Sequence, residues 1–170
     1  MADRGLTGIL LVGGSSSRFG SPKALARFEA ETLAERAWRL LGEICDERIA
    51  VGRSDGLPFR ALSDEATGPV AAIATGLRAA EHEVAVVIPV DMPLITADAL
   101  RLLAEACRDA AVAQAGPLPC AVTRRTLPAF ETGERRLRAV LDGLDTARIQ
   151  LDERLLANVN TQVDLDTLVP

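Results

Sequence analysis

The sequence predicts an α/β fold in which helices cover both faces of a mostly parallel sheet. Short, almost wholly apolar runs recur along the 170 residues, as expected for strands buried on both faces. Segments with helical spacing of apolar residues separate these runs, and the connections are short. The composition, 48% hydrophobic and 3% aromatic, supplies an aliphatic interior sufficient for one core. We therefore expect a three-layer α/β/α arrangement in a single domain over residues 1–170.

The N-terminal half is expected to alternate strands with helices. Gly8–Val12 is an apolar run that two glycines stop, which is typical of a buried strand. Helical spacing then begins at Leu33, and Thr32 is suited to cap that helix. Pro69 suits the first turn of an alanine-rich helix that fits closely against a sheet. The elements expected in this half are strands at 8–12 and 47–51, a short strand near 59–62, and helices at 33–44 and 70–80.

The strongest strand pattern in the chain lies at Val84–Val90, which is almost wholly apolar and rich in β-branched residues. We expect this strand at the centre of the sheet, with Asp91 at its carboxyl end. Thr96 is expected to cap a helix whose inner face carries Leu100, Leu103, Ala104 and Cys107. The remaining expected elements are strands at 110–114 and 120–123, helices at 127–131 and 136–141, and a terminal helix at 163–168 with Thr161 and Asp164 in capping-box-like spacing.

Charge and hydropathy argue against two classes of partner. The net charge is −5, and the basic groups are scattered apart from Arg135, Arg136 and Arg138, so nucleic-acid binding is not expected. The N-terminus lacks a signal-peptide pattern, and no apolar run is long enough to cross a bilayer. We therefore expect a cytoplasmic protein without a membrane partner.

The cysteines and the single histidine exclude several kinds of site. Cys45, Cys107 and Cys120 are odd in number and lack CxxC spacing, which disfavours a zinc site and a disulfide framework. We interpret them as small buried side chains in a reducing compartment. His82 lies between two glutamates and is interpreted as a surface residue, so mechanisms that need a Ser-His-Asp or Cys-His arrangement are not expected.

A turn rich in glycine and serine follows the first strand at Gly13–Gly20. Several backbone N–H groups of such a turn face one direction and suit phosphate oxygens, while glycine permits close approach. The spacing matches neither GxGxxG nor GxxxxGK[ST], so neither a dinucleotide fingerprint nor a P-loop is indicated. Arg18 and Lys23 would neutralise phosphate charge beside the turn. The alternative is a structural turn with solvated surface charges.

Asp91 extends the hypothesis of a phosphate site to one that also binds a metal ion. A carboxylate directly after a central strand is well placed to hold Mg²⁺, which takes one or two carboxylates and keeps waters and phosphate oxygens as its other ligands. Asp91 and the Gly-rich turn are expected at the same sheet edge, where open α/β folds bind ligands. The alternative for Asp91 is a turn residue at the entry to the next helix.

The ordered motifs of this chain resemble those of the molybdenum cofactor guanylyltransferase family, a branch of the glycosyltransferase-A-like nucleotidyltransferases with a Rossmann-like fold. The resemblance covers nearly the whole chain. Its motifs are Leu11–Leu25, Asp64 ahead of Gly68-Pro69, Pro89–Pro93, Gly133–Arg138 and Asn158–Thr161. Several ordered motifs together are specific, whereas any one alone is not.

The resemblance implies transfer of GMP from Mg²⁺-GTP to the terminal phosphate of molybdopterin, which yields molybdopterin guanine dinucleotide and pyrophosphate. It implies GTP and molybdopterin as small-molecule partners and allows for transient contact with molybdenum cofactor delivery proteins. The nucleophile is an ionised phosphomonoester, so positioning and charge neutralisation can carry the catalysis without a histidine base. The resemblance also implies a role for each site residue. The base and ribose would be contacted by Leu11, Val12, Gly13 and Gly14, and the triphosphate would be neutralised by Arg18 and Lys23. Asp64 would lie near the guanine or ribose, Asp91 would bind magnesium, and Asn158 and Asn160 would lie on the pterin side or at the metal-phosphate cluster.

The sequence departs from the family pattern at several positions. Val12 replaces a usual alanine, and Pro22 stands where the family commonly has aspartate, which removes a carboxylate near the phosphates. The usual asparagine after the second strand has no clear counterpart in Val51–Ser54, and Gln114–Pro119 lacks the usual His-Pro. Without the family, Asn158 and its neighbours are equally well explained as turn-forming residues ahead of a capped helix.

Two alternatives follow from these departures. One is a related nucleotidyltransferase that uses CTP or a sugar-phosphate acceptor, but Gly13-Gly14, where cytidylyl relatives more often have Ala-Gly, favours guanine. The other is a non-catalytic nucleotide-binding module. The presence of Arg18, Lys23 and Asp91 argues against that module.

Overall fold

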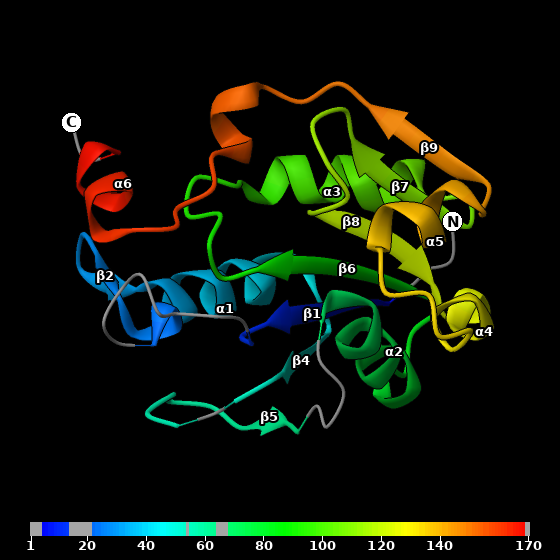
Figure 1. Cartoon of the computed structure of the whole chain (residues 1–170), viewed down its shortest axis with the longest axis horizontal. Helices are drawn as coiled ribbons and strands as arrows, with labels where there is room; N and C mark the ends of the chain where they lie inside the picture. The colour runs from blue at the N-terminus through cyan, green and yellow to red at the C-terminus, as the bar shows by residue number, and fades with distance from the viewer. Residues whose placement is uncertain (1–4, 14–21, 54, 64–67, 169–170) are drawn as a thin grey trace.

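The computed structural model describes residues 5–13, 22–53, 55–63 and 68–168. Its centre is a seven-stranded sheet with the order β5-β4-β1-β6-β8-β7-β9 (Figure 1). Only β8 runs antiparallel to its neighbours, β6 and β7. The mostly parallel sheet expected from the sequence is confirmed, and β6 is its central strand. The strands are β1 (Leu6–Leu11), β4 (Glu47–Val51), β5 (Ala61–Leu62), β6 (Val84–Pro89), β7 (Ala110–Ala113), β8 (Cys120–Thr123) and β9 (Thr146–Ile149).

Helices cover both faces of this sheet and give the three predicted layers (Figure 1). Successive residues of a strand point to opposite faces. Leu10 and Ile88 therefore belong to the core beneath α1 and α3, whereas Ile9 and Val87 belong to the core beneath α2. The helices of the first layer are α1 (Leu33–Ile44), α3 (Ala97–Ala106) and α6 (Gln162–Thr167), and those of the second are α2 (Pro69–Ala79), α4 (Leu127–Phe130) and α5 (Leu137–Asp142).

Glycines allow helices from both layers to lie close to β1. A Cβ atom at Gly8 of β1 would lie 3.0 Å from Cδ2 of Leu41 on α1. A Cβ atom at Gly76 of α2 would lie 2.8 Å from Cδ1 of Ile9 on the opposite face. These contacts agree with the prediction that the alanine-rich helix packs tightly on the sheet, and they hold β1 between two helices.

The start of α1 follows from its local sequence. The Thr32 hydroxyl accepts a hydrogen bond from the Glu35 N–H, and the Glu35 carboxylate accepts one from the Thr32 N–H, so both form a capping box. A small hairpin of β2 (Arg27–Phe28) and β3 (Glu31–Thr32) leads into this cap. The hairpin was not expected from the sequence, because each of its strands has only two residues.

Most predicted elements appear with boundaries that match or are shifted by one or two residues. The sequence missed β9 and the 3₁₀ helices η1 (Lys23–Leu25), η2 (Arg124–Thr126) and η3 (Glu153–Leu156). Cys107, which was expected on the inner face of α3, is the residue that ends this helix, and its side chain packs against the expected core. Within the described residues, no helix is long and apolar enough to cross a membrane.

Candidate active site

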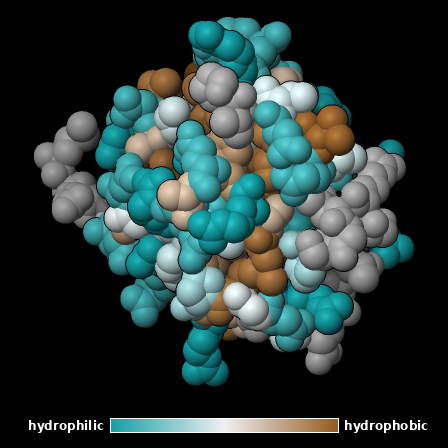
Figure 2. All heavy atoms as spheres, turned by 90° about the vertical axis from the view of Figure 1, so that its left-hand side faces the viewer, coloured by the Kyte–Doolittle hydropathy of each residue, from teal (hydrophilic) through white to brown (hydrophobic). Residues whose placement is uncertain are grey.

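The carboxyl ends of β1, β4 and β6 meet at one edge of the sheet, on the left of Figure 1. Just beyond β1, the N–H of Val12 donates to the carbonyl of Val51 at 3.0 Å. Just beyond β6, the N–H of Val90 donates to the carbonyl of Leu11 at 3.3 Å. The segments that leave these strands therefore run side by side. Figure 2 views the molecule from this edge and shows apolar side chains exposed between hydrophilic ones.

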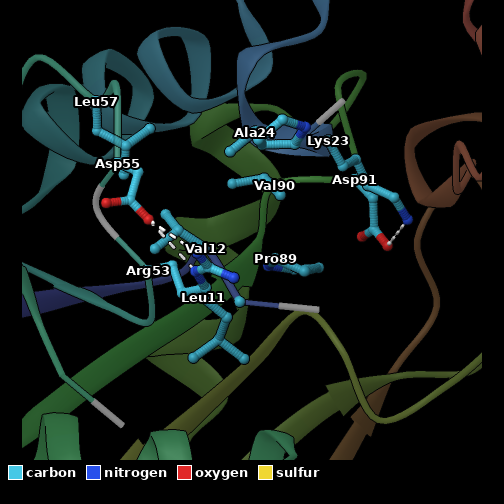
Figure 3. Close-up of a pocket in the computed structure, with 12 residues that line it drawn as sticks. Leu11, Val12, Lys23, Ala24, Arg53, Asp55, Leu57, Pro89, Val90 and Asp91 are labelled. Carbon is cyan, nitrogen blue, oxygen red and sulfur yellow. Dashed lines mark hydrogen bonds and ion pairs between the residues drawn. The ribbon is translucent and has the colours of Figure 1, made fainter. Parts of the chain in front are cut away.

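A pocket of about 440 Å³ opens at this edge. Figure 3 shows Arg53 and Asp55 on one side of it and Lys23 and Asp91 on the other, with apolar residues between them. A volume of several hundred Å³ with a few charged groups on an apolar lining is typical of sites for small molecules. The lining consists of Leu11–Gly13 after β1, Pro22–Ala24 at η1, Arg53, Asp55 and Leu57 after β4, and Pro89–Asp91 at the end of β6.

Lys23, Asp91 and Asn160 form the charged centre of the site. The Nζ atom of Lys23 lies 3.4 Å from Oδ2 of Asp91 and donates to Oδ1 of Asn160 at the same distance of 3.4 Å. The side chains of Lys23 and Asp91 are 17% and 23% exposed, so water screens the ion pair only in part. One ammonium group thus faces two oxygen atoms that come from distant parts of the chain.

Asn158 holds the other side of the Asp91 carboxylate. With its amide nitrogen facing Asp91, the Asn158 side chain donates to Oδ1 at 3.0 Å and to the main-chain oxygen at 3.3 Å. The N–H of Val159, which is buried, donates to the same main-chain oxygen at 2.9 Å. Asn158 therefore orients Asp91, and Oδ2 is the carboxylate oxygen that faces Lys23.

A side chain of α1 also holds the turn that carries Asp91. The Nε of Arg36 donates to the carbonyl of Pro93 at 2.7 Å, and the Arg36 guanidinium lies 5.1 Å from the ring centre of Phe28. Arg36 also pairs with Glu29 of the hairpin. The unexpected hairpin thus serves the site, because it supports the arginine that holds the turn after β6.

Asn160 stands at the start of α6. The carboxylate of Asp164 accepts hydrogen bonds from the N–H groups of Asn160 at 2.8 Å and Thr161 at 2.9 Å, and the Thr161 hydroxyl accepts one from the Asp164 N–H. These donors, first among them the Asn160 N–H, lower the pKa of Asp164 below its usual value. The capping box predicted from the sequence is confirmed, and it fixes the main chain of Asn160 close to Lys23.

The segment after β4 forms the wall opposite Lys23. Arg53 and Asp55 form an exposed ion pair of 3.2 Å on this wall. The ring of Phe59 stacks on that of Trp38 in α1 with 4.2 Å between the ring centres. This stack ties the segment to α1 and so fixes where the wall stands.

Gly52 lets this wall approach the turn after β1. Its φ is +129°, and an added Cβ atom would lie only 2.6 Å from the N atom of Gly13. The N–H of Gly52 donates to the carbonyl of Leu62 at 2.9 Å, which helps to hold the glycine in this conformation. The close approach of Gly52 and Gly13 requires glycine at position 52.

The structure brings together most of the predicted site residues that it describes. Lys23, Asp91, Asn158 and Asn160 are mutual neighbours, and Leu11, Val12 and Gly13 line the adjoining pocket. The predicted roles of Gly14, Arg18 and Asp64 concern positions outside the described residues.

Sequence reasoning missed the wall that Arg53, Asp55 and Leu57 contribute. Their position just after a predicted strand of a parallel sheet could have identified them, since open α/β sheets bind ligands beyond the carboxyl ends of their strands. His82 precedes β6 and therefore lies at the opposite edge from Asp91, where it is partly buried against Gly5.

Comparison with known proteins decides the family. The family model described as MobA-like NTP transferase domain matches residues 8–151. The chain belongs to this family. As a MobA-like NTP transferase, it is a nucleotidyltransferase of the group that takes part in molybdenum cofactor biosynthesis. A relative from Chloroflexus aggregans, named probable molybdenum cofactor guanylyltransferase, is 32% identical over 94% of this chain and 91% of its own.

Solved structures agree with the fold of this MobA-like chain. Molybdopterin-guanine dinucleotide biosynthesis protein A from Archaeoglobus fulgidus has a TM-score of 0.79 and 21% identity, with 95% of both chains covered. The 4-diphosphocytidyl-2C-methyl-D-erythritol synthase from Anaerococcus prevotii has a TM-score of 0.75 and 12% identity, with 96% of both chains covered. Proteins whose names refer to a guanine dinucleotide and to a cytidyl compound therefore share this fold.

Proposed function

We propose that this chain, acting as one domain, transfers GMP from Mg²⁺-GTP to molybdopterin and so forms molybdopterin guanine dinucleotide and pyrophosphate. The observation that carries the proposal is the meeting of Lys23, Asp91, Asn158 and Asn160 beside a pocket at the carboxyl ends of β1 and β6. The name of the Chloroflexus aggregans relative supports the choice of guanine and of the molybdenum cofactor.

The shape of the pocket supports a nucleotide as its occupant. The apolar lining between the two charged ends suits a flat base and a ribose, with Leu11, Val12 and Gly13 as their contacts. The end that holds Lys23 suits the triphosphate, because an ammonium is a strong partner for phosphate oxygens. In this pose, Gly14 and Arg18 would reach the phosphates and Asp64 the guanine or ribose, as the family resemblance implies.

The residues present fit a magnesium ion that arrives with phosphate. Among the described residues, no group of three or more His, Cys, Asp or Glu side chains could hold a metal alone. Asp91 and Asn160 instead offer one carboxylate oxygen and one amide oxygen, both 3.4 Å from the cationic Nζ of Lys23. Mg²⁺ accepts such a partial set of hard oxygen ligands when phosphate oxygens and waters complete it.

The reaction requires the protein mainly to position the two substrates and to neutralise phosphate charge. An oxygen of the molybdopterin phosphate attacks the α-phosphorus of GTP, and the bond from that phosphorus to the bridging oxygen of the β-phosphate breaks. Pyrophosphate leaves with this oxygen and the bonding electrons, so the step balances without removal of a proton. Bound Mg²⁺ would supply charge neutralisation at the α-phosphate and the leaving group. Lys23 would hold the phosphates in line, and Asn158 would keep Asp91 oriented.

The test compares nucleotides and then identifies the product. Purified protein with Mg²⁺ should be stabilised against heating by GTP more than by CTP or ATP, since at equal concentration the ligand that binds the folded state more tightly stabilises it more. Incubation with molybdopterin and GTP should then release pyrophosphate and yield the guanine dinucleotide. Equal stabilisation by all nucleotides would contradict the guanine assignment, and CTP-dependent product would favour the cytidylyl alternative.

Replacement of Asp91 separates catalysis from binding. Asp91→Ala should abolish pyrophosphate release while the protein remains folded, because the main-chain oxygen at position 91 still accepts from Val159. Circular dichroism and the melting temperature check the fold. Nucleotide binding without product from wild-type protein, with any nucleotide, would favour the non-catalytic module.

A further inference from the structure

We propose that Arg53 and Asp55 determine the choice of guanine, because together they present a row of hydrogen-bonding groups that complements the edge of this base. The inference rests on the proposed function, in which a nucleoside triphosphate fills the pocket with its phosphates at Lys23. The apolar lining can contact the face of any base, so the choice among bases needs polar groups at the base edge.

Arg53 and Asp55 stand where the base is expected. Figure 3 shows them on one wall of the pocket, with Lys23 and Asp91 on the other wall and apolar residues between. The base and the phosphates of a nucleotide are attached to different carbons of the ribose and extend apart. Phosphates held at Lys23 therefore direct the base toward the wall that carries Arg53 and Asp55.

The pair of Arg53 and Asp55 has a defined order of donors and acceptors. Nε and Nη2 of Arg53 both donate to Oδ2 of Asp55, at 3.3 and 3.2 Å. The other oxygen, Oδ1, points away from Arg53 (Figure 3). A guanidinium has N–H groups on all three nitrogens, and a carboxylate oxygen accepts more than one hydrogen bond. Starting from the arginine, the pair thus presents a donor, then Oδ2 as an acceptor, then Oδ1 as a second acceptor.

Guanine presents the complementary order. Its Watson–Crick edge carries the O6 acceptor, the N1–H donor and the 2-amino donor in a row. Arg53 can donate to O6 while Asp55 accepts from N1–H and from the 2-amino group. Cytosine begins instead with its 4-amino donor and adenine with its 6-amino donor, and in both an acceptor nitrogen follows. These two bases would set a donor against Arg53 and an acceptor against Oδ2, so the pair opposes them.

Packing fixes the wall on which the pair stands. Gly56 has a φ of +79°, and an added Cβ atom would lie 2.9 Å from Cδ1 of Leu25 in η1. The main chain directly after Asp55 is therefore held against η1. The side chains of Arg53 and Asp55 are 90% and 79% exposed, and water screens an exposed ion pair so that it adds little stability. The fold positions the pair without depending on it, and its groups are accessible to a ligand.

The test measures the binding of three purine nucleotides by isothermal titration calorimetry, with Mg²⁺ and without an acceptor. Inosine triphosphate (ITP) lacks the 2-amino group of GTP, and xanthosine triphosphate (XTP) carries an oxygen in its place. Wild type should bind GTP about tenfold more tightly than ITP, because the bond from the 2-amino group to Asp55 is lost. XTP should bind most weakly, since its oxygen faces the carboxylate.

Two variants divide the recognition between the two residues. Asp55→Asn should reverse the preference between GTP and XTP, because an amide can accept from N1–H and donate to the oxygen of xanthine. Arg53→Met should weaken GTP and ITP by the same factor, since both carry O6, and should leave their affinity ratio within about twofold of that of wild type.

Asp142→Asn is the matched control. The Asp142 carboxylate is also partly exposed and pairs with an arginine, Arg148, at 2.7 Å. It lies just before β9, at the sheet edge opposite the pocket. Its affinities for the three nucleotides should stay within about twofold of those of wild type.

The outcomes separate this inference from the proposed function. If GTP binds and yields product, but ITP binds equally tightly or Asp55→Asn still prefers GTP to XTP, only this inference is wrong. A reversal in Asp64→Asn instead of Asp55→Asn would also overturn it, because the family resemblance places Asp64 near the guanine or ribose. If wild type binds none of the nucleotides, the proposed function itself is wrong.

Discussion

At the scale of the residue, the orientation of Asp91 depends on partners that are remote in sequence. Asn158 donates to its carboxylate and to its main-chain oxygen, and Val159 donates to the latter. The site is thus assembled by the segment that follows β9, although the acid itself follows β6. A hydrogen bond to a charged group contributes about 1.5–3 kcal/mol, so loss of Asn158 should be measurable.

Asn158→Ala should raise the Mg²⁺ concentration needed for half-maximal pyrophosphate release by about tenfold, because one carboxylate oxygen loses its fixed donor. Titration of Mg²⁺ at fixed GTP measures the change, and the melting temperature without nucleotide tests the fold. Gln162→Ala is the control, since its amide donates to the exposed carboxylate of Asp166 on α6. An unchanged Mg²⁺ requirement would show that Asp91 keeps its orientation without Asn158.

The buried cysteines make the free energy of unfolding depend on pH in the alkaline range. Burial raises the pKa of Cys107 to about 11 and that of Cys45 to about 12, and burial also raises the pKa of Cys120. An unfolded thiol has a pKa of about 8.5. Below that pKa the folded and the unfolded protein both keep the thiol proton, so the thiol's contribution to the free energy of unfolding is fully present. As the pH rises above it, the unfolded chain loses protons that the folded protein keeps, and the free energy of unfolding falls.

We expect the urea midpoint to decline between about pH 8.5 and 11, and to decline less in Cys107→Ala than in wild type. Urea unfolding at constant ionic strength and a series of pH values measures both slopes. Parallel slopes for the two proteins would mean that Cys107 titrates alike when folded and unfolded.

At the scale of the element, the connection from β4 to β5 forms a pocket wall because it is held at several points. Phe59 stacks on Trp38, and the N–H of Gly52 bonds to Leu62. Gly52 is the tightest of these points, since its φ of +129° disfavours a side chain and any Cβ would meet Gly13. The spacing between the wall and the turn after β1 therefore depends on one residue.

Gly52→Ala should cost about 1–3 kcal/mol of unfolding free energy, because it adds backbone strain and a collision with Gly13. It should also weaken stabilisation by GTP. Gly116→Ala is the control, since no heavy atom of the described residues, its chain neighbours apart, lies within 4 Å of its added Cβ. Urea unfolding of both variants gives the comparison, and equal midpoints would contradict the need for glycine at position 52.

At the scale of the whole molecule, two apolar layers hold the sheet and keep the ends of β1 and β6 in register. Leu10 and Leu100 are fully buried in the layer beneath α1 and α3. Leu100 and Leu102 lie on the same helix, yet their exposed fractions are 0% and 48%. The helix therefore offers a leucine on each side of the boundary between core and solvent.

Leu100→Ala should lower the free energy of unfolding by about 2–5 kcal/mol, because truncation in a dense core loses apolar burial and leaves a cavity. Leu102→Ala should cost much less, since nearly half of its side chain is already in water. Chemical unfolding of the two variants measures the difference. Similar costs would mean that α3 does not pack as the structure describes.

The sequence by itself determined the α/β class, the central strand, the main helices with their caps and, through ordered motifs, the family. Those features are set by local patterns, because apolar periodicity and capping act over a few residues. Only the tertiary structure decided the antiparallel course of β8, the short strands of the hairpin and β9, and the wall that contains Arg53. Such strands gain stability from pairing partners rather than from their own sequence.

The site shows the same division. Lys23 and Asp91 were found from the sequence, yet they lie 68 residues apart, and Lys23 lies 137 residues from Asn160. No local pattern reports which oxygen of Asp91 faces Lys23 or that Asn158 holds the other. Those facts follow from the packing of β1, β6 and the segment before α6, because only the folded chain brings these groups within hydrogen-bonding distance.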